Sequence, residues 1–158
     1  MNLTQKERML LEDQRAHEED CVQKYQDFSN QAQDPQLKQL FQSYAAQEQQ
    51  HLNTINQILS GQIPNMTGQN QQQSQPTAQV IQNITSSAQG AGYNQNDAKL
   101  CKDSLMTEKF VSGAYNTTIF ECTDKNLRQV LNHIQKEEQQ HGEGIFNYMR
   151  SKGMYPVS

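Results

Sequence analysis

The sequence has no tryptophan, and its 158 residues include only 3 cysteines and 4 prolines. No apolar run approaches the roughly 20 residues that span a bilayer, and the N-terminus is too charged for the core of a signal peptide. Three cysteines cannot all pair within one chain, and none forms the short-spaced pairs of a zinc or redox motif. We therefore expect free thiols, synthesis in the cytoplasm and no membrane partner.

Basic residues are also few: 13 Lys and Arg stand against 17 Asp and Glu, and they are scattered along the chain. A nucleic-acid-binding protein would gather its positive charge on one face, so we expect no nucleic-acid partner. A chain of this length fits one domain with a single core, and we expect residues 1–158 to form it.

Charge disappears entirely between Leu52 and Asn96, and from Gly61 onward the chain is rich in Gln, Asn, Ser and Gly. This composition predicts a linker over about 61–96. A linker of about 36 residues is too long for a turn, but it suits a crossover along a helix of about 28 residues, which is about 42 Å long. Within it, the spacing of apolar residues in 77–87 predicts a short helix lying on the bundle.

The chain contains a duplication on the two sides of this linker. The four letters Glu48-Gln49-Gln50-His51 occur again at Glu138-Gln139-Gln140-His141, 90 positions later. The same offset pairs further residues without gaps: Glu18 with Glu108, Tyr25 with Tyr115, Asp34 with Asp124, and Leu37 with Leu127. Each half therefore repeats one pattern of six residues.

Each half reads as two long helices joined by a tight turn. Thr4 and Glu7 form a plausible capping box, and Asp34 with Pro35 starts a second helix that ends at Gly61. We expect hairpins over about 4–60 and 97–152, with Asn96 or Asp97 as the cap of the third helix, and a tail over 153–158 with an aromatic anchor. Two hairpins with one apolar stripe each predict an all-α, up-down-down-up four-helix bundle with a long crossover.

Carboxylates interrupt the apolar stripes at the same depth in all four helices. Buried together, they would repel one another strongly unless some are protonated or cations neutralise them. Two divalent ions, four carboxylates and two neutral imidazoles sum to zero charge, and a Glu from two helices plus Glu-x-x-His from the other two is the ligand set of dinuclear bundles. The predicted metal ligands are Glu18, Glu48, His51, Glu108, Glu138 and His141.

Oxygen and imidazole ligands without thiolate favour two transition-metal ions, Fe first, with Mn or Zn as alternatives. Tyr25 and Tyr115 are either core aromatics or donors of a hydrogen bond to a ligand carboxylate. His17 and His133 lack a Glu three residues before them and are expected at the surface. A bundle with protonated carboxylates and no metal stays an open alternative.

The first hairpin resembles the rubrerythrin branch of the ferritin-like superfamily, on the segments HEEDCVQKYQDFSNQAQD, LKQLF and AAQEQQH. The resemblance implies a ferritin-like bundle whose six predicted ligands act as bridging and terminal ligands. The chain departs from that family in three ways: it has no Cys-rich rubredoxin module, its linker is longer than metal chemistry needs, and Val111 stands where rubrerythrins tend to carry another Glu. The last departure argues against peroxidase-type chemistry.

The second half resembles the Coat F family of endospore coat proteins, whose domains tend to end in a pattern such as Lys152-Gly153-Met154-Tyr155-Pro156. This resemblance implies a spore-forming bacterium, deposition in the spore coat and other coat proteins as partners. Two functions follow as hypotheses: a metal-binding protein that handles iron, oxygen or peroxide, or a structural coat component whose metal site only stabilises the fold. A homodimer stays open, and the sequence identifies no catalytic residue.

Overall fold

The computed structural model describes residues 2–64 and 92–155, and these form four helices and no strand. The helices are α1 (Gln5–Gln31), α2 (Pro35–Leu59), α4 (Gln95–Glu121) and α5 (Lys125–Ser151). The short helix expected over 77–87, most of the crossover and residues 156–158 lie outside the described residues. None of the four helices is long and apolar enough to cross a membrane.

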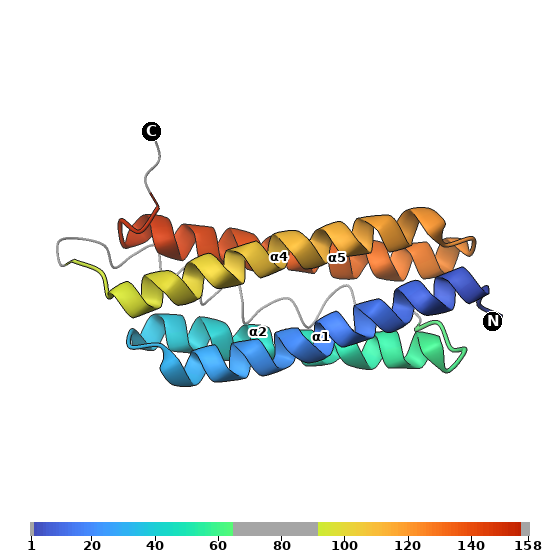
Figure 1. Ribbon diagram of the computed structural model, residues 1–158, viewed down its shortest axis with the longest axis horizontal. Helices are drawn as coiled ribbons and strands as arrows, with labels where there is room; N and C mark the ends of the chain where they lie inside the picture. The colour runs from blue at the N-terminus through green and yellow to red at the C-terminus, as the bar shows by residue number, and fades with distance from the viewer. Residues whose placement is uncertain (1, 65–91, 156–158) are drawn as a thin grey trace.

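The helices pack as two antiparallel hairpins, α1 with α2 and α4 with α5, laid one on the other along their length (Figure 1). In Figure 1, α2 and α4 run in the same direction, whereas α1 and α5 run in the opposite one. The expected all-α architecture of two packed hairpins is therefore confirmed for the described part of the chain.

The predicted helix ends are largely confirmed. Thr4 and Glu7 form the capping box of α1, and Asp34 caps α2 with Pro35 in its first turn. Gly61 follows α2 with a φ of 93°, and Gly153 follows α5 with a φ of 72°. These positive angles suit glycine, which has no Cβ to clash with the backbone.

The predicted cap of α4 is wrong. Asn94, rather than Asn96 or Asp97, caps this helix by accepting from the backbone N–H of Asp97. Asp97 is instead buried, and its carboxylate accepts from the backbone N–H groups of Gln33 at 2.8 Å and Asp34 at 2.9 Å. This acidic residue therefore ties α4 to the turn of the other hairpin.

Glu7 makes the corresponding contact at the other end of the bundle. Its Oε1 accepts from the backbone N–H of Thr123 at 2.8 Å and from the Thr123 hydroxyl at 2.9 Å, while Oε2 accepts from the N–H of Thr4. Glu7 and Asp97 lie 90 positions apart, so the duplication includes this tie between the halves.

Replacing Glu7 by glutamine is expected to lower the free energy of unfolding by roughly 1.5–3 kcal/mol, the range for hydrogen bonds to a charged group. Burial alone would raise the pKa of Glu7, but the hydrogen bonds from Thr123 and Thr4 outweigh it and lower the pKa to about 2. The stabilisation is therefore present above the usual value of 4.5 and is lost as the pH falls through about 2.

Urea unfolding of Glu7→Gln and wild type at pH 7 and pH 3 measures this effect. The difference between the two proteins should shrink at pH 3, and the exposed Glu12→Gln should match wild type throughout. A difference that is the same at both pH values would contradict the role assigned to the carboxylate.

Two apolar clusters fill the bundle, one toward each end. One includes Leu40, Phe41 and Tyr148, and the other includes Leu11 and Ile58. All three cysteines are buried and free, as expected; burial and nearby acidic charge raise the pKa of Cys101 to about 12 and that of Cys122 to about 11.

The tail differs from the prediction in its anchor. Met154 is the buried residue there, and its backbone N–H bonds to the carbonyl of Met149 at 2.8 Å. Tyr155 stays 40% exposed and only rests its ring edge on Phe146.

Candidate metal centre

The six residues predicted as metal ligands meet midway along the bundle, between the two apolar clusters. Each helix contributes the carboxylate expected of it, and α2 and α5 add the imidazoles. No side chain of the set exceeds 4% exposure. The residues brought together are Glu18, Glu48, His51, Glu108, Glu138 and His141.

Their ligand atoms fall into two overlapping groups. One contains Glu18 and His51, the other contains Glu108 and His141, and Glu48 and Glu138 belong to both. Within each group the ligand atoms lie within 4.8 Å of one another. Two positions that share two carboxylates have the arrangement of a dinuclear site.

Both imidazoles turn Nδ1 toward the shared carboxylates. His51 Nδ1 lies 3.1 Å from Glu48 Oε2 and 3.0 Å from Glu138 Oε1. His141 Nδ1 lies 3.0 Å from Glu48 Oε1 and 3.5 Å from Glu138 Oε2. The nitrogen facing the centre is thus the same in both halves, and the ring centroids stand 5.8 Å apart in a stacked arrangement.

The partners of the Nε2 atoms of the two imidazoles were not predicted from the sequence. His51 Nε2 lies 2.9 Å from Glu137 Oε2, and His141 Nε2 lies 2.9 Å from Gln47 Oε1. Each contact crosses from one hairpin to the other. A donated Nε2–H leaves Nδ1 as the free ligand atom, which is how outer partners set the tautomer of a metal-binding histidine.

The tyrosines cross between hairpins as well. The Tyr25 hydroxyl donates to Glu108, and the Tyr115 hydroxyl donates to Glu18. Burial and the neighbouring carboxylates raise the pKa of both phenols well above their usual value, so both keep the proton that they donate. Each lone Glu is thereby oriented by the other half of the chain.

Three carboxylate oxygens are left over after these contacts. Glu18 Oε2, Glu108 Oε2 and Glu138 Oε2 are buried and accept no hydrogen bond from any residue of 2–64 or 92–155. An unpaired buried carboxylate oxygen is costly, and a cation removes that cost. The spare oxygens and the inward Nδ1 atoms therefore fit two divalent ions.

Without metal, the carboxylates differ in protonation. Burial and the charge of Glu138 raise the pKa of Glu18 well above its usual value, and burial raises the pKa of Glu108 to about 8. Burial would also raise the pKa of Glu48 and Glu138, but the two imidazoles outweigh it and lower both. The metal-free surroundings thus favour the protonated form of Glu18 and Glu108 and the anionic form of Glu48 and Glu138.

The imidazoles balance those anions. Burial alone would lower the pKa of His51, but the charge of Glu138 and the hydrogen bond with Glu137 raise it well above the usual value. For His141 the charges of Glu48 and Glu108 have the same net effect. Cationic imidazoles are thus favoured beside the anionic forms of Glu48 and Glu138.

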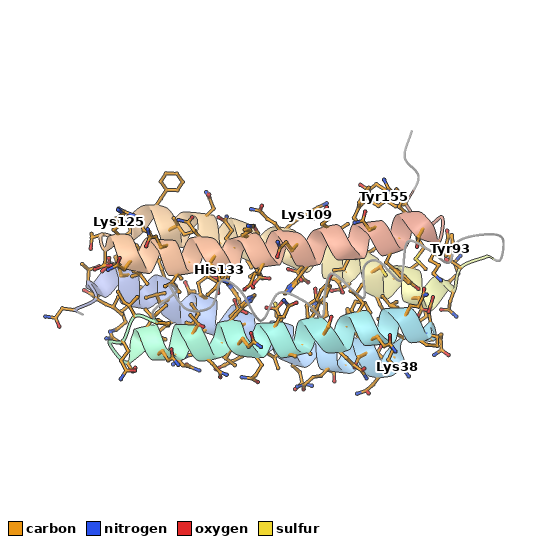
Figure 2. All side chains as sticks on the ribbon, turned by 180° about the vertical axis from the view of Figure 1, so that it is seen from behind. Lys38, Tyr93, Lys109, Lys125, His133 and Tyr155 are labelled. Carbon is orange, nitrogen blue, oxygen red and sulfur yellow. The ribbon has the colours of Figure 1, made fainter. Side chains whose placement is uncertain are left out.

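A crevice of about 520 Å³ leads from the surface between α4 and α5 to Glu108 and Glu138. Gly113 and Gly142 line it, and a Cβ at Gly113 would meet nothing within 4 Å. Lys109 also lines it and is labelled on this hairpin in Figure 2. The centre is therefore approached from the α4–α5 side.

The two remaining histidines lie outside the centre. His17 is half-buried rather than exposed, with its ring 5.2 Å from Phe110. His133, labelled in Figure 2, has a side chain that is 38% exposed, and its Nε2 lies 3.5 Å from Glu137 Oε1. Neither reaches the shared carboxylates.

Residues 96–158 match the family model of the Coat F domain. No curated protein and no solved structure matches the chain. The match begins at the start of α4 and covers the second hairpin, which supplies half of the ligands: Glu108, Glu138 and His141. The resemblance of the second half to the Coat F family is thereby confirmed.

Proposed function

We propose that this chain is a spore coat component whose bundle binds two divalent transition-metal ions at its centre. The coat role is supported by the Coat F domain match over residues 96–158. The metal site is supported by one observation above the others: two buried groups of Glu and His that share Glu48 and Glu138.

The ferritin-like class of the bundle belongs to the same proposal. A carboxylate from each of two helices and Glu-x-x-His from each of the other two is the ligand pattern of such dinuclear bundles. Glu48 and Glu138 would bridge the ions, Glu18 with His51 would complete one position, and Glu108 with His141 would complete the other. Iron fits these ligands best, with manganese or zinc as substitutes.

The shared carboxylates, the tyrosines and the apolar clusters would each contribute to this centre. Glu48 and Glu138 would hold both ions, and the hydroxyls of Tyr25 and Tyr115 orient Glu108 and Glu18. The two apolar clusters exclude water from both ends of the site. Iron held in this way would supply one-electron chemistry with oxygen or peroxide, whereas a redox-inert ion would serve the stability of the bundle.

Elemental analysis of protein purified without chelator tests the metal proposal. About two transition-metal ions per chain are expected, as for the dinuclear bundles with this ligand set. No bound metal, even after anaerobic loading with Fe(II), would contradict it. Oxygen consumption or peroxide turnover by the Fe(II)-loaded protein then separates a redox role from a purely structural one.

The coat proposal has its own test. An antibody against the chain should detect it in the coat fraction of purified spores and not in the spore core. Its presence only in vegetative cells would contradict the coat role and leave the metal measurement unaffected.

A further inference from the structure

We propose that the two metal positions are inequivalent. The ion held by Glu18 and His51 is bound tightly, whereas the ion held by Glu108 and His141 is weaker and exchanges with solvent. This inference rests on the proposed metal binding and extends it by ranking two positions that the duplication makes look equal.

The first observation is a difference in the outer partners of the imidazoles. Nε2 of His51 lies 2.9 Å from a carboxylate oxygen of Glu137. Nε2 of His141 lies 2.9 Å from the amide oxygen of Gln47. Residues 47 and 137 are equivalent under the 90-residue offset, so the duplication has diverged here. A carboxylate partner makes the imidazole a better ligand and adds a negative charge near the ion, whereas an amide adds none.

The second observation concerns access. The crevice between α4 and α5 reaches Glu108 and the shared Glu138, and glycines stand at positions 113 and 142 of its wall. The equivalent residues of the first hairpin are the larger Gln23 and Leu52. Solvent therefore approaches the Glu108 position through a gap opened by missing side chains.

A third difference between the two positions is the charge of the residue next to the lone glutamate. Lys109 lines the crevice next to Glu108, and its equivalent beside Glu18 is Glu19. The positive charge of Lys109 disfavours a cation at the nearer position, whereas Glu19 lies 4.0 Å from Arg15 and leaves no such unpaired positive charge beside Glu18. Outer partner and local charge thus weaken the Glu108–His141 position relative to its twin, and access speeds the exchange of its ion.

Zn(II) titration followed by NMR of the histidine rings tests the ranking on the full chain. The four histidines allow assignment: His17→Gln and His133→Gln remove two ring signals, and His141 is identified by its ring contact with Tyr44, 4.2 Å between centroids. At one equivalent of Zn(II) the His51 signals should shift first, with a preference of at least about 10-fold, the usual effect of an outer partner.

The reciprocal double variant Gln47→Glu/Glu137→Gln is the decisive control, because it exchanges the outer partners and leaves all six ligands in place. The order of filling should then reverse or become even. Gly142→Leu copies Leu52 and should slow the exchange of the second ion without changing the equilibrium zinc content.

Equal filling in wild type, or His141 filling first, would overturn the ranking, and an order unchanged by the double variant would overturn the role of the outer partners. In each of these, zinc still binds and the proposed metal function stands. If no ring signal shifts and no zinc co-elutes with the protein, the metal function itself fails together with the ranking.

Discussion

Replacing Glu48 by alanine is expected to remove both metal ions, because this carboxylate belongs to both groups of ligands. Glu138→Ala should do the same, whereas Glu18→Ala and Glu108→Ala should each leave one position with three of its four ligands. Bound metal should fall from about two ions per chain to near none in the first pair, and to about one in the second pair. Elemental analysis after gel filtration measures the difference.

The same substitutions also change the stability of the metal-free protein, so the folding of each variant must be measured separately. Breaking a buried ion pair by removing one partner costs about 3–5 kcal/mol, so Glu48→Ala also lowers the free energy of unfolding. Glu48→Gln keeps the shape and one acceptor, and circular dichroism shows whether each variant stays folded. A folded Glu48→Gln that still held two ions would contradict the bridging role.

Metal loading at pH 7 is expected to release protons. The raised pKa values of His51 and His141 favour cationic imidazoles before loading, and the raised values of Glu18 and Glu108 favour protonated carboxyls. Any of these groups that carries a proton must lose it to become a ligand. Metal affinity therefore rises with pH, since fewer protons remain to be displaced.

Calorimetric titration with Zn(II) in two buffers of different ionisation enthalpy counts these protons. At a metal concentration 1,000 times the dissociation constant, each bound ion stabilises the fold by about 4 kcal/mol, so two ions contribute about 8 kcal/mol. A chelator should then lower the melting temperature by roughly 16–32 °C for a chain of this size. Loading without proton release would contradict the protonation states assigned to the metal-free centre.

The clustering of the six candidate ligands could be predicted because each lies on an apolar stripe with helical spacing and has a twin 90 positions away. The pairs Glu48 with Glu138 and His51 with His141 carry both signals. The helix caps at Thr4 and Asp34 could be predicted from local chemistry alone, since a cap bonds within its own first turn.

What the sequence did not predict depends on contacts between hairpins. Glu137 is adjacent to Glu138 in the sequence but does not lie on the apolar stripe. Only the packing of α5 against α2 brings it to His51. The sequence favours Asp97 as a cap because Asp is common at helix N-caps. Its actual bonds to the turn at Gln33 and Asp34 could not be predicted, because they come from the other hairpin. The offset of 90 held a usable signal here, because it pairs Asp97 with the Glu7 of a recognised capping box.

The sharing of Glu48 and Glu138 between the two positions has an evolutionary consequence. One comes from the first hairpin and the other from the second, so a single hairpin completes neither group. An ancestor with one hairpin would have needed a two-fold dimer to hold metal, and in such a dimer residues 47 and 137 would have been identical by symmetry. A single chain is free of that symmetry, and glutamine stands at position 47 while glutamate stands at position 137.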